Sequence, residues 1–502
     1  MYEWIIITAG IFAFTASCGI GANDAANSFA TSIGSKALKI RHAIFVAMIM
    51  ETSGAIIMGT HVSKTIRKGI ADYKCFQDDP YVLMYGCMVV CLSVGIWLFL
   101  ASKYEMPVST THSAVGGMIG MTMALKGSDC VIWYEDKDTF PYIGGVSGIV
   151  LSWVISPVFS FIIASVLFWL TRTIVLRSEN SFNRIFWYYP FIITFTLALN
   201  AFYIVYKGAK GMNLDDISFR EASIYSFSIG IGITLLTLPF IPKIKLMIED
   251  KFDHEKNVDA TPTQNVDTLS ITSPKLSKEE LSEKNILFRM YYYIKTAYNS
   301  DDIHTDTFEK DENVNDIHNN AEKFDEKTEE LFKYLQVFTA CCDSFSHGAN
   351  DVANAMGPFM AAYVIYETGK VSKKADPGDD VYWILSIGGV GIGLGLLLYG
   401  YKIIKALGVK ICKITPTRGV AIELASALVV ISGSRLEIPL STTHCQVGAT
   451  LGVAALEDVK DCHGINCNIV LKAVIGWIAT LIIVGGSTAL LVSQGAYAPE
   501  VQ

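Results

Sequence analysis

A polar stretch occurs twice in this chain, each time inside apolar sequence. Gly21–Asn27 reads GANDAAN, and Gly348–Asn354 reads GANDVAN. A second motif follows each copy: Met106–His112 reads MPVSTTH, and Ile438–His444 reads IPLSTTH. The first motifs begin 327 positions apart and the second motifs 332 positions apart. Two motifs in the same order at nearly the same offset indicate an internal duplication, so we expect two related halves.

The composition places these halves in a membrane. Of 502 residues, 51% are hydrophobic and 18% are charged, and several apolar runs approach or exceed the roughly 20 residues that cross a bilayer. The first run, which starts at Trp4, lacks the basic front and cleavage site of a signal peptide. We therefore predict an all-α polytopic membrane protein, with one transmembrane half at 1–242 and the other at 336–502.

About twelve membrane segments are expected, seven before a polar linker and five after it. Three of them, at 108–125, 418–434 and 438–456, are short for a full crossing and are expected to be re-entrant or broken. An odd number before the linker reverses the second half relative to the first. The two halves are then inverted-topology repeats, the arrangement with which transporters alternate access around one site.

Basic loops set the expected orientation. Clusters at 36–41, 172–184 and 402–413 all lie on the linker side, and the positive-inside rule places that side in the cytoplasm. Arg67 and Lys68 are an exception on the other side. Both termini and the 126–141 loop are then outside.

The linker at 243–335 carries all of the net charge. It holds 13 Lys and Arg against 21 Asp and Glu, which equals the whole-chain value of −8. Such a segment cannot bury enough apolar surface to fold alone, so we expect it to be mostly disordered. Within it, 286–295 could form a helix on the membrane surface or on the protein, and 321–336 a charged helix leading into the next segment. Nothing in this charge pattern implies a nucleic-acid partner.

The eleven cysteines are scattered, several within apolar runs. They are interpreted as small hydrophobic residues rather than a disulfide framework. Cys462 and Cys467 flank a histidine, but one such pair only weakly indicates a metal site.

The Asn-Asp motif has the chemistry of a cation site. On a helix, Asn23 and Asn27 share a face, with Asp24 beside them. A carboxylate and two amides inside a membrane are costly unless they face a cavity or bind something. The preceding glycine suits a helix that loosens there and frees carbonyl oxygens. Such hard oxygen ligands suit Na⁺ or a proton-linked site, predicted at Asp24, Asn27, Asp351 and Asn354; interhelical hydrogen bonding is the alternative.

The Pro-x-Ser-Thr-Thr-His motif favours an anion instead. Proline suits the first turn of a helix, and Ser and Thr cap helix N-termini. The free N–H groups and partial positive charge of that end attract anions. We predict an oxyanion site at Ser109, Thr110, Thr111, Ser441, Thr442 and Thr443; plain capping is the alternative. For His112 and His444, packing is favoured over contact with the anion.

Glu51 and Glu423 are lone carboxylates in apolar segments. Neither has a basic residue one turn away, so a local ion pair is not expected, and cation binding or proton coupling is favoured over a structural hydrogen bond. Asp343 and His347 occur only in the second half. The corresponding positions of the first half are occupied by Ala16 and Ile20.

These motifs together resemble those of the inorganic phosphate transporter family, the sodium- or proton-coupled phosphate permeases. The resemblance covers nearly the whole chain outside the linker, and also rests on Glu51–Gly54, Thr65–Ile70 and Thr415–Gly419. It implies phosphate symport with Na⁺ favoured over H⁺, an inverted-repeat core, no enzymatic activity and no cofactor. A homodimer, with the plasma membrane as the favoured location, is also implied. By the resemblance, Asp24 and Asp351 hold Na⁺, Asn23 and Asn350 join the phosphate site, and Glu51 and Glu423 match transport-critical glutamates.

Three other functions compete with phosphate symport. A carrier for another oxyanion such as sulfate is the nearest, because hydroxyl and amide donors discriminate weakly between oxyanions. An intramembrane hydrolase could use Ser109 or Ser441 with a histidine, but the duplication of every element argues against one nucleophile. A passive anion channel leaves the membrane carboxylates without a role.

Overall fold

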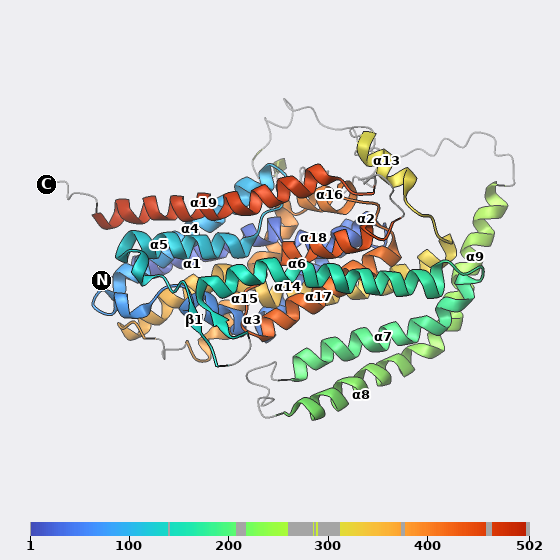
Figure 1. The fold of residues 1–502 in the computed structure, drawn as a ribbon, viewed down its shortest axis with the longest axis horizontal. Helices are drawn as coiled ribbons and strands as arrows, with labels where there is room; N and C mark the ends of the chain where they lie inside the picture. The colour runs from blue at the N-terminus through green and yellow to red at the C-terminus, as the bar shows by residue number, and fades with distance from the viewer. Residues whose placement is uncertain are drawn as a thin grey trace.

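The computed structural model describes residues 2–138, 141–206, 217–259, 285, 288–289, 312–372, 377–457 and 464–497. Over these residues it is a helical bundle (Figure 1), with one small antiparallel sheet of β1 (Glu135–Asp136) and β2 (Ile143–Gly144). Nine stretches of the described chain are helical, long and apolar enough to cross a membrane. The predicted all-α class is confirmed. The linker predicted to be mostly disordered is helical where the structure describes it at 243–259, in 312–320 and from 326 onward, and the prediction is wrong for the first two of these parts. Most of the linker between 260 and 311, including most of the predicted helix at 286–295, lies outside the described ranges.

The helices follow one another in the order that the apolar segments predicted. They are α1 (Glu3–Asn23), α2 (Ala26–Gly34), α3 (Ile40–Lys68), α4 (Pro80–Lys103), α5 (Thr110–Lys126), α6 (Gly145–Thr171), α7 (Ser181–Val205), α8 (Phe219–Thr237), α9 (Ile241–Asp259), α13 (Glu312–Asn320), α14 (Glu326–Thr368), α15 (Asp380–Tyr399), α16 (Tyr401–Lys410), α17 (Pro416–Arg435), α18 (Thr442–Ala454) and α19 (Cys467–Tyr497). The charged helix expected at 321–336 begins at Glu326 and is the first part of α14.

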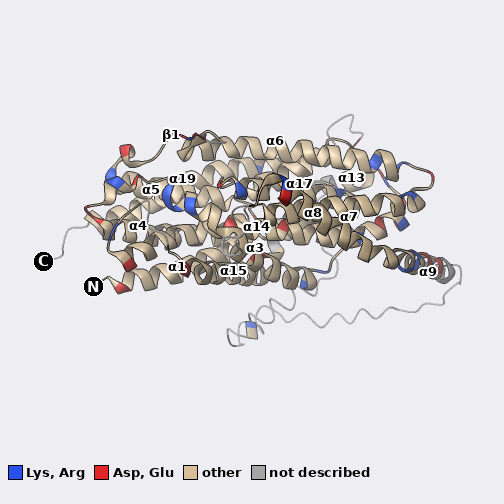
Figure 2. Ribbon diagram, turned by 90° about the horizontal axis from the view of Figure 1, so that it is seen from below, with Lys and Arg blue, Asp and Glu red and all other residues tan. Residues whose placement is uncertain are grey.

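The bundle has two distinct ends. Figure 1 shows the start of α1 and the end of α19 at one end, here called the terminal end, and α9, α13 and α16 toward the other, the linker end. At the terminal end the Tyr497 hydroxyl donates to the Leu125 carbonyl (3.1 Å), and at the linker end Lys251 pairs with Glu330 (2.8 Å). Charged residues concentrate toward these two ends in Figure 2. The helices between the two ends are long and apolar enough to lie within a bilayer.

Two helical hairpins enter the bundle from opposite ends. Hairpin 1 consists of α4 and α5, and an ion pair between Asp79 and Lys126 (2.7 Å) closes its base at the terminal end. Hairpin 2 consists of α17 and α18, and its base is closed at the linker end by Arg418 and Glu457. The three short segments of the sequence form α5, α17 and α18, whereas α4 comes from a segment of full length, 82–102. A count of twelve crossings stays a prediction.

The motif glycines allow helix backbones to touch. A Cβ on Gly21 would lie 1.7 Å from the Ile392 carbonyl oxygen of α15, and one on Gly348 would lie 2.2 Å from the Glu51 carbonyl oxygen of α3. Small residues that permit such contact are typical of membrane helix packing. The first copy of the motif is also interrupted, because α1 ends at Asn23 and α2 begins at Ala26. The second copy runs unbroken through α14, so the predicted loosening there is wrong.

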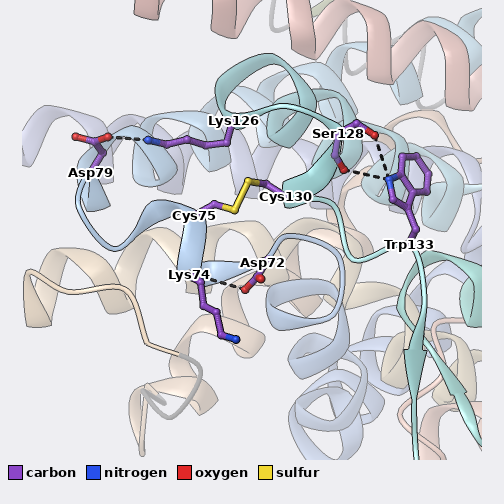
Figure 3. Close-up of a disulfide and its surroundings, with 8 residues drawn as sticks. All are labelled: Asp72, Lys74, Cys75, Asp79, Lys126, Ser128, Cys130 and Trp133. Carbon is purple, nitrogen blue, oxygen red and sulfur yellow. Dashed lines mark hydrogen bonds and ion pairs between the residues drawn. A yellow bond between two sulfur atoms is a disulfide. The ribbon is translucent and has the colours of Figure 1, made fainter.

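A disulfide joins Cys75, between α3 and α4, to Cys130, just after α5 (Figure 3). The interpretation of the cysteines as hydrophobic residues only is therefore wrong for this pair, which is separated by 55 positions in sequence. The hairpin brings the two together at the terminal end, next to Asp79 and Lys126. The other described cysteines are free and mostly buried. Cys462 lies outside the described residues, and so does the metal hypothesis based on it.

The Gly21→Ala variant should be unstable. Its methyl group overlaps the α15 backbone, which cannot rotate away, so we expect a loss of at least about 1–3 kcal/mol in the free energy of unfolding. The measurement is the fraction of purified protein that stays monodisperse after heating in detergent. The control is Gly232→Ala on α8, where a Cβ meets nothing within 4 Å. Equal melting of the two variants would contradict this account of the motif glycine.

Candidate functional site

The two aspartates of the repeated motif meet at the centre of the bundle. Asp24 and Asp351 are 1% and 0% exposed. The Thr110 hydroxyl lies 2.8 Å from Asp24 Oδ2 and 3.1 Å from Asp351 Oδ2. Thr442 donates to Asp351 (2.9 Å), and Thr443 donates to Asp24. Each aspartate therefore contacts both hairpins, and the structure unites the two predicted sites into one cluster.

Both hairpin turns present a helix N-terminus to this cluster. Ser109 and Ser441 are the N-caps of α5 and α18, and the Ser441 hydroxyl donates to the Ser109 hydroxyl (2.9 Å). The Thr110 backbone N–H lies 3.2 Å from Asp24 Oδ2. Thr111 reaches across the turns and donates to the Leu440 carbonyl (2.7 Å). Two positive helix ends and six hydroxyls thus converge on one point, which favours negative charge there.

The first asparagine of each motif holds a hairpin turn in place. The Asn23 amide donates to the Met106 carbonyl (3.0 Å) and accepts from the Val108 N–H (3.0 Å). The Asn350 amide lies 3.1 Å from the Ser434 hydroxyl of hairpin 2. Because these amides are used within the protein, they position the hairpins. This differs from the predicted contact of Asn23 and Asn350 with phosphate.

The second asparagine of each motif carries an unsatisfied oxygen. Asn27 donates to Asp24 (2.6 Å), and Asn354 donates to Thr110 (3.0 Å). The side-chain oxygens of both asparagines are buried without a hydrogen-bond partner. A buried acceptor of this kind needs a donor or a cation to offset its lost hydration. The same atom is left without a partner in both copies of the motif, beside Asp24 in one and beside Thr110 in the other.

His112 and His444 turn away from the cluster. The His112 ring stacks on Trp153 with centroids 3.6 Å apart, and His444 Nδ1 lies 2.9 Å from the Trp153 carbonyl oxygen. Their backbone N–H groups donate to Ser109 and Ser441 (3.3 Å each). The packing role favoured from the sequence agrees with this geometry, and neither ring contacts a serine as a base would.

Glu51 is linked to the cluster through a histidine. His347 Nδ1 lies 2.7 Å from Glu51 Oε2, and its Nε2 lies 3.0 Å from Asp351 Oδ2. The expectation from the sequence concerned only partners one turn away on the same segment, whereas His347 comes from another helix, α14. Sequence reasoning noted His347 as unique to the second half but not its contact with Glu51. A basic residue that lacks a counterpart in the other repeat was the available signal.

Glu423 lies in a separate buried cluster between α2, α14 and α17. It accepts from Thr31 (2.6 Å), Ser32 (2.7 Å), Thr339 (2.5 Å) and Gln336 (3.2 Å). These four donors were not identified from the sequence. The feature that could have identified them is the presence of polar side chains in otherwise apolar helices. The cluster is not part of the central site.

Asp343 is a second carboxylate close to Glu423, with hydrogen bonds from Ser28 and Ser426. At the offset of 332, the counterpart of Glu423 is Cys91. Glu51 and Glu423 are therefore not equivalent residues of the two repeats.

Three of the central residues lie close enough together that they could hold a cation. Asp24, His347 and Asp351 each offer a ligand atom, and these three atoms lie within 4.8 Å of one another. The residues that the structure describes contain no other such group of His, Cys, Asp and Glu. Threonine hydroxyls and the two unsatisfied asparagine oxygens surround the three ligand atoms. Carboxylate, hydroxyl and amide oxygens are hard ligands that suit a hard cation.

Comparison with known proteins identifies the family. A model of the phosphate transporter family matches residues 20–488. The phosphate-repressible phosphate permease pho-4 of Neurospora crassa is 29% identical over 96% of both chains, and the sodium-dependent phosphate transporter 1 of Rattus norvegicus is 26% identical over 98% of this chain and 95% of its own. The chloroplastic inorganic phosphate transporter 2-1 of Arabidopsis thaliana is 31% identical over 96% of this chain and 70% of its own.

A solved structure titled the sodium-dependent phosphate transporter superposes with a TM-score of 0.74 and 29% identity, and the match covers 99% of this chain and 100% of the other. The family and the named relatives are transporters and permeases rather than enzymes, so the hydrolase interpretation is excluded. The chain is an integral multi-pass membrane protein that belongs to the phosphate transporter family.

Proposed function

We propose that this protein imports inorganic phosphate together with Na⁺, by alternating access to one central site. Family membership supports the substrate, and the names of the rat relative and of the solved structure support the ion. The observation that carries the proposal is the position of two buried carboxylates, Asp24 and Asp351, directly beside two converging helix N-termini.

Electrostatics explains why such a site needs both ions. Two unit charges 4.8 Å apart, the span of the central ligand group, interact by about 3.5 kcal/mol at an effective dielectric constant of about 20. Phosphate next to Asp24 and Asp351 would meet that repulsion from each carboxylate. A cation held by the same carboxylates removes it, so each ion increases the affinity for the other. A passive channel would gain nothing from this arrangement.

The residues divide by the chemistry of their side-chain atoms. Hydroxyls of the two hairpin turns, most of which donate within the protein in this structure, would turn to phosphate oxygens when the substrate binds: Ser109, Thr110, Thr111, Ser441, Thr442 and Thr443. Oxygen atoms that can only accept hydrogen bonds suit Na⁺, and these belong to Asp24, Asp351, Asn27 and Asn354. We assign Asn23 and Asn350 to holding the hairpins, because Asn23 binds backbone groups of one turn and Asn350 lies against Ser434 of the other hairpin.

The three remaining acidic groups fit supporting roles. Glu51 and His347 extend the central cluster through Asp351, so they set its charge and offer a path for H⁺ if a proton replaces Na⁺. Glu423 with Asp343 forms an oxygen-rich cluster between α2, α14 and α17, which suits a second cation. Residence in the plasma membrane and assembly as a homodimer stay predictions.

The two hairpins support an inverted repeat. Hairpin 1 has its base at the terminal end and hairpin 2 at the linker end, as a two-fold relation within the membrane plane requires. The basic residues Arg172 and Arg177, which contact Glu322, lie at the linker end. The disulfide lies at the terminal end, and disulfides persist in oxidising compartments. The proposed orientation therefore has the terminal end outside and the linker end in the cytoplasm.

Intact cells test this orientation. A membrane-impermeant maleimide should label the wild-type protein only after an impermeant reductant has opened the Cys75–Cys130 bond. The Cys130→Ser variant leaves Cys75 free, so it should be labelled without reductant. The exposed Cys467, at the start of α19 and at the linker end, should react only after the cells are permeabilised. Labelling of Cys467 on intact cells would reverse the orientation.

Uptake of radiolabelled phosphate into proteoliposomes tests the activity. An inward Na⁺ gradient should drive accumulation, and arsenate should compete more strongly than sulfate, because monovalent phosphate and arsenate can donate a hydrogen bond to a carboxylate. Accumulation driven by a pH gradient alone would assign the coupling to H⁺. Equal competition by sulfate would indicate a general oxyanion carrier, and flux without any gradient dependence would indicate a channel.

Matched variants separate the two sets of ligands. Ser109→Ala and Ser441→Ala each remove a buried donor worth about 1–3 kcal/mol, so the phosphate concentration for half-maximal binding should rise about 5- to 150-fold. Asn27→Ala and Asn354→Ala should mainly raise the Na⁺ concentration required. Titration of phosphate binding at several Na⁺ concentrations distinguishes the two effects.

Two controls account for indirect effects on these variants. Ser218→Ala removes an N-cap on α8, far from the cluster, and Asn200→Ala removes an amide on α7. Neither should change binding of either ion. If the asparagine variants lose phosphate binding at every Na⁺ concentration while the serine variants bind normally, the assignment is reversed.

A further inference from the structure

The turns of the two hairpins are built around a repeated glutamate. Lys103–Pro107 reads KYEMP and Arg435–Pro439 reads RLEIP, so Glu105 and Glu437 are 332 positions apart, the offset of the Ser-Thr-Thr-His motif. Both have positive φ, 56° and 58°, and only four non-glycine residues in the described ranges do. An L-residue pays about 1–2 kcal/mol for that backbone conformation. Glycine would adopt this backbone conformation without that cost, yet both turns have a glutamate there. This indicates a function for the glutamate carboxylate.

Each glutamate is paired with a lysine at the end of the bundle opposite to its hairpin base. Glu437 of hairpin 2 pairs with Lys64 of α3 at 2.8 and 3.0 Å, and its carbonyl accepts from the Thr65 hydroxyl (2.6 Å). Glu105 of hairpin 1 lies 3.7 Å from Lys410, the last residue of α16. The turns therefore pass each other near the centre of the bundle.

The position of the lysines locates each turn relative to the central cluster. Lys64 lies thirteen residues beyond Glu51 on α3, roughly 20 Å toward the terminal end. Lys410 follows Gly408, which packs against Gly34 at the end of α2. Gly34 lies ten residues beyond Asp24 toward the linker end. One turn thus lies on each side of the buried cluster.

We propose that the two hairpin turns are the gates of the transport site, latched by Lys64–Glu437 toward the terminal end and by Lys410–Glu105 toward the linker end. This inference rests on the proposed function. With both latches formed, the central residues are inaccessible from either end. Opening one turn breaks its latch and exposes the cluster to that end, while the other latch keeps the opposite end closed.

The two latches are unequal. The terminal-end latch has two short contacts to the carboxylate and one to the backbone, whereas the linker-end latch has one contact of 3.7 Å. Exposed ion pairs of this kind change a two-state ratio by about 1.5- to 5-fold. The linker-end gate should therefore open more readily, and neutralising Lys64 should alter transport more than neutralising Lys410.

Reversible cross-linking tests the terminal-end gate. Lys64→Cys with Glu437→Cys is made in the full-length protein lacking the free native cysteines, reconstituted in proteoliposomes, and treated with a short reducible thiol cross-linker. We expect Na⁺-driven phosphate uptake to fall at least 10-fold and to be restored by a reductant. Phosphate should still bind to the cross-linked protein in detergent, because it can enter through the other gate. The control is Asp79→Cys with Lys126→Cys, which joins the two helices of hairpin 1 at its base and should leave uptake within 2-fold.

Each outcome bears on the gate. Unchanged uptake after complete cross-linking would overturn the gate. Loss of uptake in the Lys64→Cys, Glu437→Cys protein before cross-linking would also overturn it, because breaking the latch should change the ratio of closed to open gate only a few-fold. The exchange Lys64→Glu with Glu437→Lys should restore the uptake rate that Lys64→Gln changes, and a failure to do so would also count against a latch. Absence of uptake by the wild-type protein would instead overturn the proposed function.

Discussion

The structure depends on the contact between carboxylates and hairpin turns at the centre of the bundle. Asp24 lies in the break between α1 and α2 and Asp351 lies within α14, and each accepts hydrogen bonds from both hairpins. Burying two carboxylates in a membrane is costly, and here hydroxyls, backbone N–H groups and helix ends offset that cost. The same groups are the ones that can bind an anion and a cation. Stability of the centre and binding of ions are therefore controlled by the same residues.

Much of this arrangement could be predicted from the sequence, because duplication and hydrophobicity are local signals. The repeated Asn-Asp and Ser-Thr-Thr-His motifs supplied the candidate residues that the structure brings into one cluster, and short apolar segments indicated parts of the hairpins. Contacts between distant residues could not be predicted in this way. The Glu51–His347 pair and the Cys75–Cys130 bond depend on how helices lie side by side, which no periodicity encodes. The use of Asn23 to hold a turn depends on the path of that turn.

The two halves share an architecture but not a charge distribution. His347 and Asp343 belong to α14 alone, and the corresponding positions of α1 are occupied by Ile20 and Ala16. The central cluster is therefore asymmetric although its aspartates and threonines are duplicated. The unbroken second motif adds to this asymmetry, since α14 is a single long helix whereas α1 and α2 are separate. The duplicated motifs thus build a cluster whose two sides differ in charge and in helix continuity.

The bases of the hairpins differ in a way that matches the two sides of a membrane. Hairpin 1 has a covalent bond beside its base, next to an ion pair, whereas hairpin 2 is closed by the buried Arg418–Glu457 pair, with the Arg418 guanidinium packed against Phe168 and Phe324. In the orientation proposed above, the disulfide faces the oxidising compartment. The Arg418–Glu457 ion pair faces the reducing cytoplasm, where a disulfide would not persist. In that orientation, the base of each hairpin is held by the kind of bond that its own compartment can sustain.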